Sequence, residues 1–211
     1  GNAEDLGYSY EFLSFLRKNL KLNIIAVEYP GYGLYNGEAN SEKIQQDALL
    51  VYDFVHKIMN VPNKNILVFG RSIGSGPACF LASQRIIGCL ILMCPYTCIG
   101  DVVRDIIGPF GKFLVQDRFR NIDFIQKVSC DILFIHGKDD KLINFKHSIQ
   151  LMQSCKGNAK MYLGEKMTHN EFLLQEDVII PILEFFQDFN IQIEKTNNNI
   201  SVPNRFYSKK N

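Results

Sequence analysis

Short apolar, β-branched runs alternate along this chain with longer amphipathic segments, and this alternation limits the fold more than any other feature. The apolar runs lie at 23–27, 66–69, 89–93, 132–135 and, more weakly, 160–163. Helical patterns occur at 8–19, 42–59, 74–84, 146–154 and 178–189. Strands that alternate with helices and are apolar on both faces form parallel sheets. The pattern therefore predicts an α/β fold in which helices flank a mostly parallel sheet.

The chain length suits a single domain. Its 211 residues, of which 46% are hydrophobic, are enough for a sizeable core. We place this domain at 1–190. The segment 95–121, between the third and fourth predicted strands, is too long for a simple connection and has its own amphipathic pattern, so we expect a short lid or insertion there. Residues 191–211 are polar and mildly basic, which predicts a frayed tail.

Charge and cysteine usage argue against several classes of function. A formal net charge of +1 gives no global field, so nucleic acid is not expected as a partner. The six cysteines include no CxxC pair, and no histidine stands at metal-ligand spacing. We therefore expect free thiols, no zinc, and a reducing compartment such as the cytosol. No apolar run is long enough to span a bilayer, and the opening GNAEDLGYSY has neither a signal-peptide pattern nor an initiator Met, which suggests a fragment.

A serine stands between two glycines where the second predicted strand meets a helix. In NILVFGRSIGSGPACFLAS, residues 65–83, Ser72 lies between Gly70 and Gly74. This Gly-x-Ser-x-Gly pattern is common by chance, but the strand before it and the helix after it supply the context that the motif requires. We expect both glycines to prevent clashes at a sharp turn that holds the serine strained and exposed. The helix dipole and the N–H of Ile73 could then stabilise a developing oxyanion.

A serine hydroxyl is a weak nucleophile unless a histidine, itself oriented by a carboxylate, removes its proton. Four histidines are present. His169 lies in the loop GEKMTHNEF after the last predicted strand and is the strongest candidate for the base. We expect His56 on a helix surface, His136 packed at a strand end and His147 in a structural role on a helix.

Two acidic residues follow the strand at 132–135. The segment HGKDDKLI places Asp139 and Asp140 just past its carboxyl end, the edge at which α/β sheets carry their sites. Either carboxylate could orient the histidine. Serine, acid and histidine then occur at successive strand ends in the order typical of α/β-hydrolases.

These motifs carry a specific resemblance. The sequence resembles the α/β-hydrolase superfamily, most closely the subgroup that includes alpha/beta hydrolase domain-containing protein 17, a set of serine hydrolases that remove palmitate from proteins. The matching text comprises GNAEDLG at 1–7, YPGYGLYNGEANSE at 29–42, the serine segment, LFIHGKDDKLINFKHSIQL at 133–151 and the histidine loop. The resemblance implies Ser72 as nucleophile, Asp140 in preference to Asp139 as acid, His169 as base, and no metal or cofactor.

The resemblance also bears on the start of the chain. The family carries a His-Gly-Asn turn whose backbone N–H forms half of the oxyanion hole, and the opening Gly-Asn is similar to its remainder. Asn2 would then supply one N–H and Ile73 the other. In that case the strands that normally precede this turn are missing, including one that lies between the strands at 23–27 and 66–69.

The sequence thus predicts a serine hydrolase that cleaves acyl ester or thioester bonds, with a palmitoyl-protein hydrolase preferred. A lipase or lysophospholipase-type carboxylesterase and a non-catalytic binding protein on the same fold stay open as alternatives. The expected partner is an acylated protein or lipid ester, in the cytoplasm or at the cytosolic face of a membrane. The substrate-binding candidates are Tyr32, Arg71, Phe110 and Phe113, and Arg71 stands where the subgroup usually has Gln. The apolar residues of 101–119 would also suit contact with a membrane surface.

Overall fold

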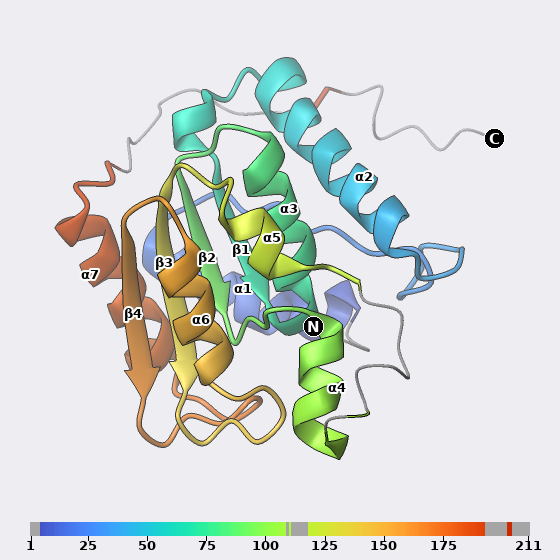
Figure 1. Cartoon of the computed structure of the whole chain (residues 1–211). Helices are drawn as coiled ribbons and strands as arrows, with labels where there is room; N and C mark the ends of the chain where they lie inside the picture. Colours follow the sequence, from blue (N-terminus) through green and yellow to red (C-terminus); the bar gives the residue numbers. More distant parts are fainter. Residues whose placement is uncertain (1–4, 109, 111–117, 193–201, 204–211) are drawn as a thin grey trace.

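The computed structural model describes residues 5–108, 110, 118–192 and 202–203, and within them parallel strands form a single four-stranded sheet (Figure 1). The order of the strands in the sheet is their order in the chain. They are β1 (Leu67–Arg71), β2 (Cys89–Met93), β3 (Asp131–Gly137) and β4 (Ala159–Gly164). Arg71 pairs with Met93, and Met93 pairs with Ile135. The carboxyl ends of neighbouring strands therefore meet at one edge of the sheet.

Helices cover both faces of this sheet. They are α1 (Leu6–Leu20), α2 (Ser41–Asp53), α3 (Ser75–Gln84), α4 (Ile99–Ile107), α5 (Asn121–Ile125), α6 (Lys146–Ser154) and α7 (Ile180–Asp188). The side chains of Asp5 and Asn40 accept hydrogen bonds from first-turn N–H groups and so fix the starts of α1 and α2. The predicted α/β fold with a parallel sheet between helices is confirmed.

The alternation of side chains along the strands divides the core into two layers. On β2, Cys89, Ile91 and Met93 belong to a cluster that includes residues of α1 and α7. Leu90 and Leu92 belong to a second cluster, with residues of α2, α3, α5 and α6 (Figure 1). Because both faces are covered, β2 is apolar at every position rather than at every second one.

The predicted strand at 23–27 is wrong. In the described part of the chain this segment pairs with no strand, and β1 forms the edge of the sheet. Ile24 packs against the core, whereas Ile25 is 50% exposed. Strand propensity favours extended backbone, but a strand also needs a neighbouring backbone that supplies hydrogen bonds.

Two predicted helices are divided by short π-helical turns. The pattern at 42–59 forms α2 only as far as Asp53 and then continues as η1 (Phe54–Ile58). The pattern at 178–189 is preceded by η5 (Leu174–Ile179), and α7 starts at Ile180. Pro181 lies in the first turn of α7, where its missing N–H costs no helical hydrogen bond.

The segment 95–121 contributes α4 and the first residue of α5. Ile99 and Val102 of α4 pack beside Tyr96 and Phe119, whereas the end of the helix is exposed. Positions 111–117 of the predicted lid, and most of the predicted tail at 191–211, lie outside the described residues. Among the described helices, none combines the length and the apolar character needed to cross a bilayer.

Candidate active site

Ser72 stands at the turn between β1 and α3. Its backbone φ of 52° lies in the left-handed region, which costs a non-glycine residue about 1–3 kcal/mol. Gly70 makes this turn possible, because a Cβ there would lie 2.6 Å from the Gly74 carbonyl oxygen. The Ser75 hydroxyl closes the turn by donating to the Ser72 carbonyl oxygen at 2.7 Å. The 3-10 turn η3 (Ser72–Gly74) then leads into α3.

Two expectations about this turn are wrong. Gly74 is not required by sterics, because the nearest atom to a Cβ added there is the Tyr29 hydroxyl oxygen at 3.5 Å, an ordinary contact. Ser72 is strained as expected, but it is only 7% exposed. Its hydroxyl faces the buried ring of His169 rather than open solvent.

The structure brings together three of the predicted side chains. His169 Nε2 lies 3.0 Å from Ser72 Oγ, and His169 Nδ1 lies 2.7 Å from Asp140 Oδ2. Because a carboxylate only accepts, Nδ1 carries the ring proton and Nε2 can accept the serine proton. Asp139, the second candidate for the acid, is exposed and donates its backbone N–H to the Met167 carbonyl. The contacts therefore favour Asp140 as the orienting carboxylate.

Four donors surround the Asp140 carboxylate. The backbone N–H groups of Leu142 and Ile143 donate to Oδ1 at 2.9 and 2.8 Å, and His169 and His136 approach Oδ2 at 2.7 and 3.4 Å. Burial by itself raises the pKa of Asp140. The hydrogen bonds from His136, His169 and the Ile143 backbone outweigh burial and hold that pKa well below its usual range. Asp140 is therefore ionised at neutral pH and can orient His169.

His136 places a second imidazole against this carboxylate, a contact that the sequence analysis missed. The ring is fully buried, with Nδ1 2.6 Å from Ser148 Oγ and Nε2 2.9 Å from the Ile143 carbonyl oxygen. A carbonyl oxygen only accepts, so Nε2 carries the proton and lies close to both Ile143 and Asp140. The spacing of four residues between His136 and Asp140 across a strand-end turn is the signal that could have revealed the contact.

Comparison with known proteins gives relatives of one kind. No protein-family model matches the chain. It is 29% identical over 171 residues to alpha/beta hydrolase domain-containing protein aho-3 of Caenorhabditis elegans, a match covering 81% of this chain and 51% of that protein. It is 28% identical over 185 residues to alpha/beta hydrolase domain-containing protein 17B of Homo sapiens, covering 88% and 63%. The chain thus spans between half and two thirds of these relatives.

Solved structures agree with these relatives. An esterase of Pyrococcus furiosus matches with a TM-score of 0.69 at 16% identity, over 86% of this chain and 76% of that structure. Mouse alpha/beta hydrolase domain-containing protein 10 matches with a TM-score of 0.65 at 16% identity, over 90% and 88%. The chain has the α/β-hydrolase fold. The resemblance to the subgroup of domain-containing protein 17, predicted from the motifs, is also confirmed.

In this α/β-hydrolase fold, Arg71 braces the loop that carries His169. Its Nη2 donates to the His169 carbonyl oxygen at 2.9 Å and to Asn170 Oδ1 at 2.8 Å, and its guanidinium lies 5.6 Å from the centre of the Phe172 ring. The sequence analysis assigned Arg71 to substrate binding. The structure instead shows a link between the serine turn and the histidine loop, because the side chain bonds groups of that loop.

Tyr29 is the tyrosine beside the serine turn. Its ring packs in a cluster with Ile73, and its hydroxyl is the group nearest the vacant Cβ position of Gly74. Burial, with a smaller effect of Tyr32, raises the pKa of Tyr29 to about 12, so it remains a hydroxyl donor. Tyr32, the predicted substrate contact, packs edge-on against Tyr29 with ring centroids 5.6 Å apart. Tyr29 opens the YPGYG segment and was the better candidate.

The other predicted site residues are not brought to Ser72. Phe110 is 82% exposed beyond the end of α4. Phe113 and Asn2, the predicted acyl contact and oxyanion donor, lie outside the described residues. Of the two predicted oxyanion donors, the structure therefore describes only Ile73, in the 3-10 turn that follows the serine.

Cys94, His136 and Asp140 bring one donor atom each to within 4.8 Å of the others, all of them buried, a spacing that could hold a metal ion. The protein itself already engages both ring nitrogens of His136 and both oxygens of Asp140. Burial, and then the Asp140 charge, raises the pKa of the Cys94 thiol to about 12. The thiol is therefore protonated, and we assign it no catalytic part.

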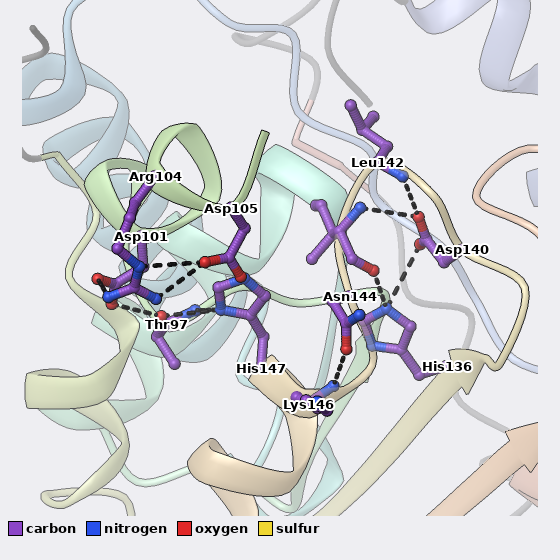
Figure 2. A network of polar contacts seen from close by, with 11 residues as sticks. Thr97, Asp101, Arg104, Asp105, His136, Asp140, Leu142, Asn144, Lys146 and His147 are labelled. Atoms are coloured by element: carbon purple, nitrogen blue, oxygen red, sulfur yellow. Dashed lines mark hydrogen bonds and ion pairs between the residues drawn. The ribbon is translucent and has the colours of Figure 1, made fainter. Parts of the chain in front are cut away.

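A second polar network joins α4 to the start of α6 (Figure 2). Thr97 Oγ1 donates to Asp101 at 2.8 Å and lies 2.9 Å from His147 Nδ1. Arg104 donates to Asp101 at 2.9 Å and to Asp105 at 3.0 Å. His147 is buried in the first turn of α6, where burial lowers its pKa. This network lies beside the Asp140 loop, as Figure 2 shows.

Proposed function

We propose that this chain is a serine hydrolase that cleaves acyl ester or thioester bonds, with Ser72 as nucleophile, His169 as general base and Asp140 as the orienting acid. The observation that carries the proposal is the continuous relay from Ser72 Oγ through the His169 ring to Asp140 Oδ2, with contacts of 3.0 and 2.7 Å. The strained turn of Ser72 at a strand end, in an α/β-hydrolase fold, supports the same assignment.

The reaction has two halves. Ser72 Oγ attacks the acyl carbonyl carbon while its proton passes to His169 Nε2, and the resulting oxyanion accepts hydrogen bonds from the backbone N–H of Ile73 and, as expected from the resemblance, of Asn2. Collapse of this intermediate expels the alcohol or thiol, which takes the proton from Nε2. Water then gives a proton to Nε2, attacks the acyl-enzyme and releases the carboxylic acid and free Ser72.

For the substrate, we propose a fatty-acylated protein, so that the leaving group is a cysteine thiol. The similarity to domain-containing protein 17 supports this choice, because that subgroup removes palmitate from proteins. Comparing the hydrolysis of a palmitoylated peptide with that of a monoacylglycerol tests it. A preference for the monoacylglycerol would replace the proposal with the lipase-type alternative.

The test of the nucleophile is intact mass after treatment with a fluorophosphonate. We expect one adduct on the chain and on Ser83→Ala, and none on Ser72→Ala. Ser83 is a matched control because it lies on α3, where its hydroxyl donates only to the Phe80 carbonyl oxygen. Equal labelling of Ser72→Ala would exclude Ser72 as the nucleophile. A folded chain that takes up no adduct would favour the non-catalytic alternative.

A further inference from the structure

A polar hollow of about 710 Å³ opens beside the acid, outside the relay. It lies between the end of α4 and the loop at 138–146, which we call the acid loop. Its lining residues come from these two segments and from α6: Arg104, Asp105, Ile106, Lys138, Asp140, Lys141, Leu142, Asn144, Lys146, His147 and Gln150. Figure 2 shows many of these side chains on neighbouring elements. We call this region the α4 surface.

The α4 surface has an excess of positive charge. Four cationic side chains line the hollow, against two carboxylates. Asp140 is buried and bonded by four donors, and Asp105 pairs with Arg104. Lys141 and Lys146 are exposed and form no ion pair within the described part of the chain. These two lysines are therefore available to an anion.

The same surface exposes apolar side chains. Ile106 and Leu142 line the hollow and are 56% and 49% exposed. Ile107, next to Ile106, and Phe110, beyond the end of α4, are also exposed. Single exposed apolar residues are ordinary, but a group of them beside unpaired lysines combines the two attractions that hold a protein at a bilayer interface.

The base of the hollow also favours an anion. His147 is 97% buried by the complement of its 3% exposed side chain, and its Nε2 has no hydrogen-bond partner, although Asp105 lies 3.3 Å away. His147 and Lys146 form the first turn of α6, where the helix dipole favours negative charge. An anionic group at this position would meet the unpaired lysines and the start of the helix together.

We propose that the α4 surface docks on a bilayer that contains anionic phospholipid. Lys141 and Lys146 bind lipid phosphate at the start of α6, while Ile106 and Leu142 enter the boundary between headgroups and acyl chains. The docking itself does not depend on the proposed function. If both hold, docking brings the acid loop, and with it Asp140, close to the membrane in which acylated substrates are anchored.

The test is co-sedimentation of the full chain with vesicles of phosphatidylcholine, with and without phosphatidylserine. We expect binding only with phosphatidylserine, and weaker binding as salt is added. The double variant Lys141→Gln/Lys146→Gln should lower the partition coefficient about 25-fold, or about fivefold for each lysine. Lys127→Gln/Lys156→Gln is the matched control, because both lysines are exposed and precede β3 and β4 at the opposite edge of the sheet.

Three further arms complete the design. Ile106→Ser/Leu142→Ser should also weaken binding, whereas Ser72→Ala should bind as the parent does, which separates docking from catalysis. Binding lost equally in both lysine pairs would overturn the proposal, because it would reflect overall charge. Equal binding to neutral vesicles would overturn it too. Inorganic phosphate that shifts the His147 ring resonances, without any vesicle binding, would replace the bilayer with a small-anion site.

Discussion

At the scale of single residues, His136 controls how the acid is held. It is one of four donors around the Asp140 carboxylate, and its ring is fixed from both sides by Ser148 and the Ile143 carbonyl. Asp140 in turn orients His169 toward Ser72. His136 thus acts on the reaction through Asp140, as a positioning residue.

We expect His136→Leu to lower kcat for an acyl ester roughly tenfold with little change in KM, because the acid loses a donor while the contacts of the substrate stay intact. His136→Gln, whose amide can replace the Nε2 donor, should recover part of the loss. Steady-state kinetics well below the unfolding temperature provide the measurement.

His56→Leu is the matched control, since His56 is half-buried and contacts the Val61 carbonyl oxygen, remote in sequence from the acid loop. Its kcat should equal that of the parent. A His136→Leu variant with unchanged kcat, or one altered only in KM, would contradict the positioning role.

At the scale of elements, the close packing of α3 depends on Gly76. A Cβ at Gly76 would lie 2.5 Å from Phe119 Cγ, whereas one at Gly74 would meet its nearest neighbour at 3.5 Å. Phe119 is itself buried, with a left-handed φ of 47°, so it has little freedom to move away. The segment before α5 and the helix after the serine are therefore packed backbone against ring.

Gly76→Ala should lower the free energy of unfolding by about 1–3 kcal/mol, because the added methyl overpacks this contact. Gly74→Ala is the matched substitution two residues away and should be neutral or stabilising by about 0.4–1 kcal/mol, since its φ of −66° suits alanine. Urea unfolding of both variants measures the difference. Equal stability of the two would contradict the packing described here.

At the scale of the whole molecule, the network that joins α4 to α6 makes stability depend on pH. Burial, partly opposed by Asp105 and Asp101, lowers the pKa of His147 below its ordinary value of 6.5. As the pH falls through about 6.5, the unfolded chain takes up a proton that the folded chain resists. Stability is therefore lost on acidification, by up to about 1.4 kcal/mol per pH unit.

His147→Gln removes this contribution, so its free energy of unfolding should fall less than that of the parent between about pH 7 and pH 5. Asp105→Asn removes an opposing carboxylate and should make the fall steeper. Urea titrations across this range measure both slopes. Parent-like slopes in His147→Gln would assign the pH dependence to other groups.

Local patterns of the sequence were sufficient for most elements. The strand at 89–93 and the helix at 146–154 have the predicted bounds, because an apolar run or an amphipathic period belongs to the segment itself. Ser72, Asp140 and His169 could likewise be chosen before the fold was known, since a serine turn and residues at parallel strand ends have local signatures. The resemblance separated Asp140 from Asp139.

The tertiary structure decided whatever depends on a distant partner. The segment 23–27 has strand propensity but no backbone to pair with in the described chain, so it forms no strand. Arg71 bonds the His169 loop, far away in sequence, rather than a substrate. Tyr29 reaches the serine turn and Ser72 is buried because loops from separate strands converge there. Propensity and periodicity are properties of neighbouring residues, whereas pairing, bracing and burial arise only when remote segments meet.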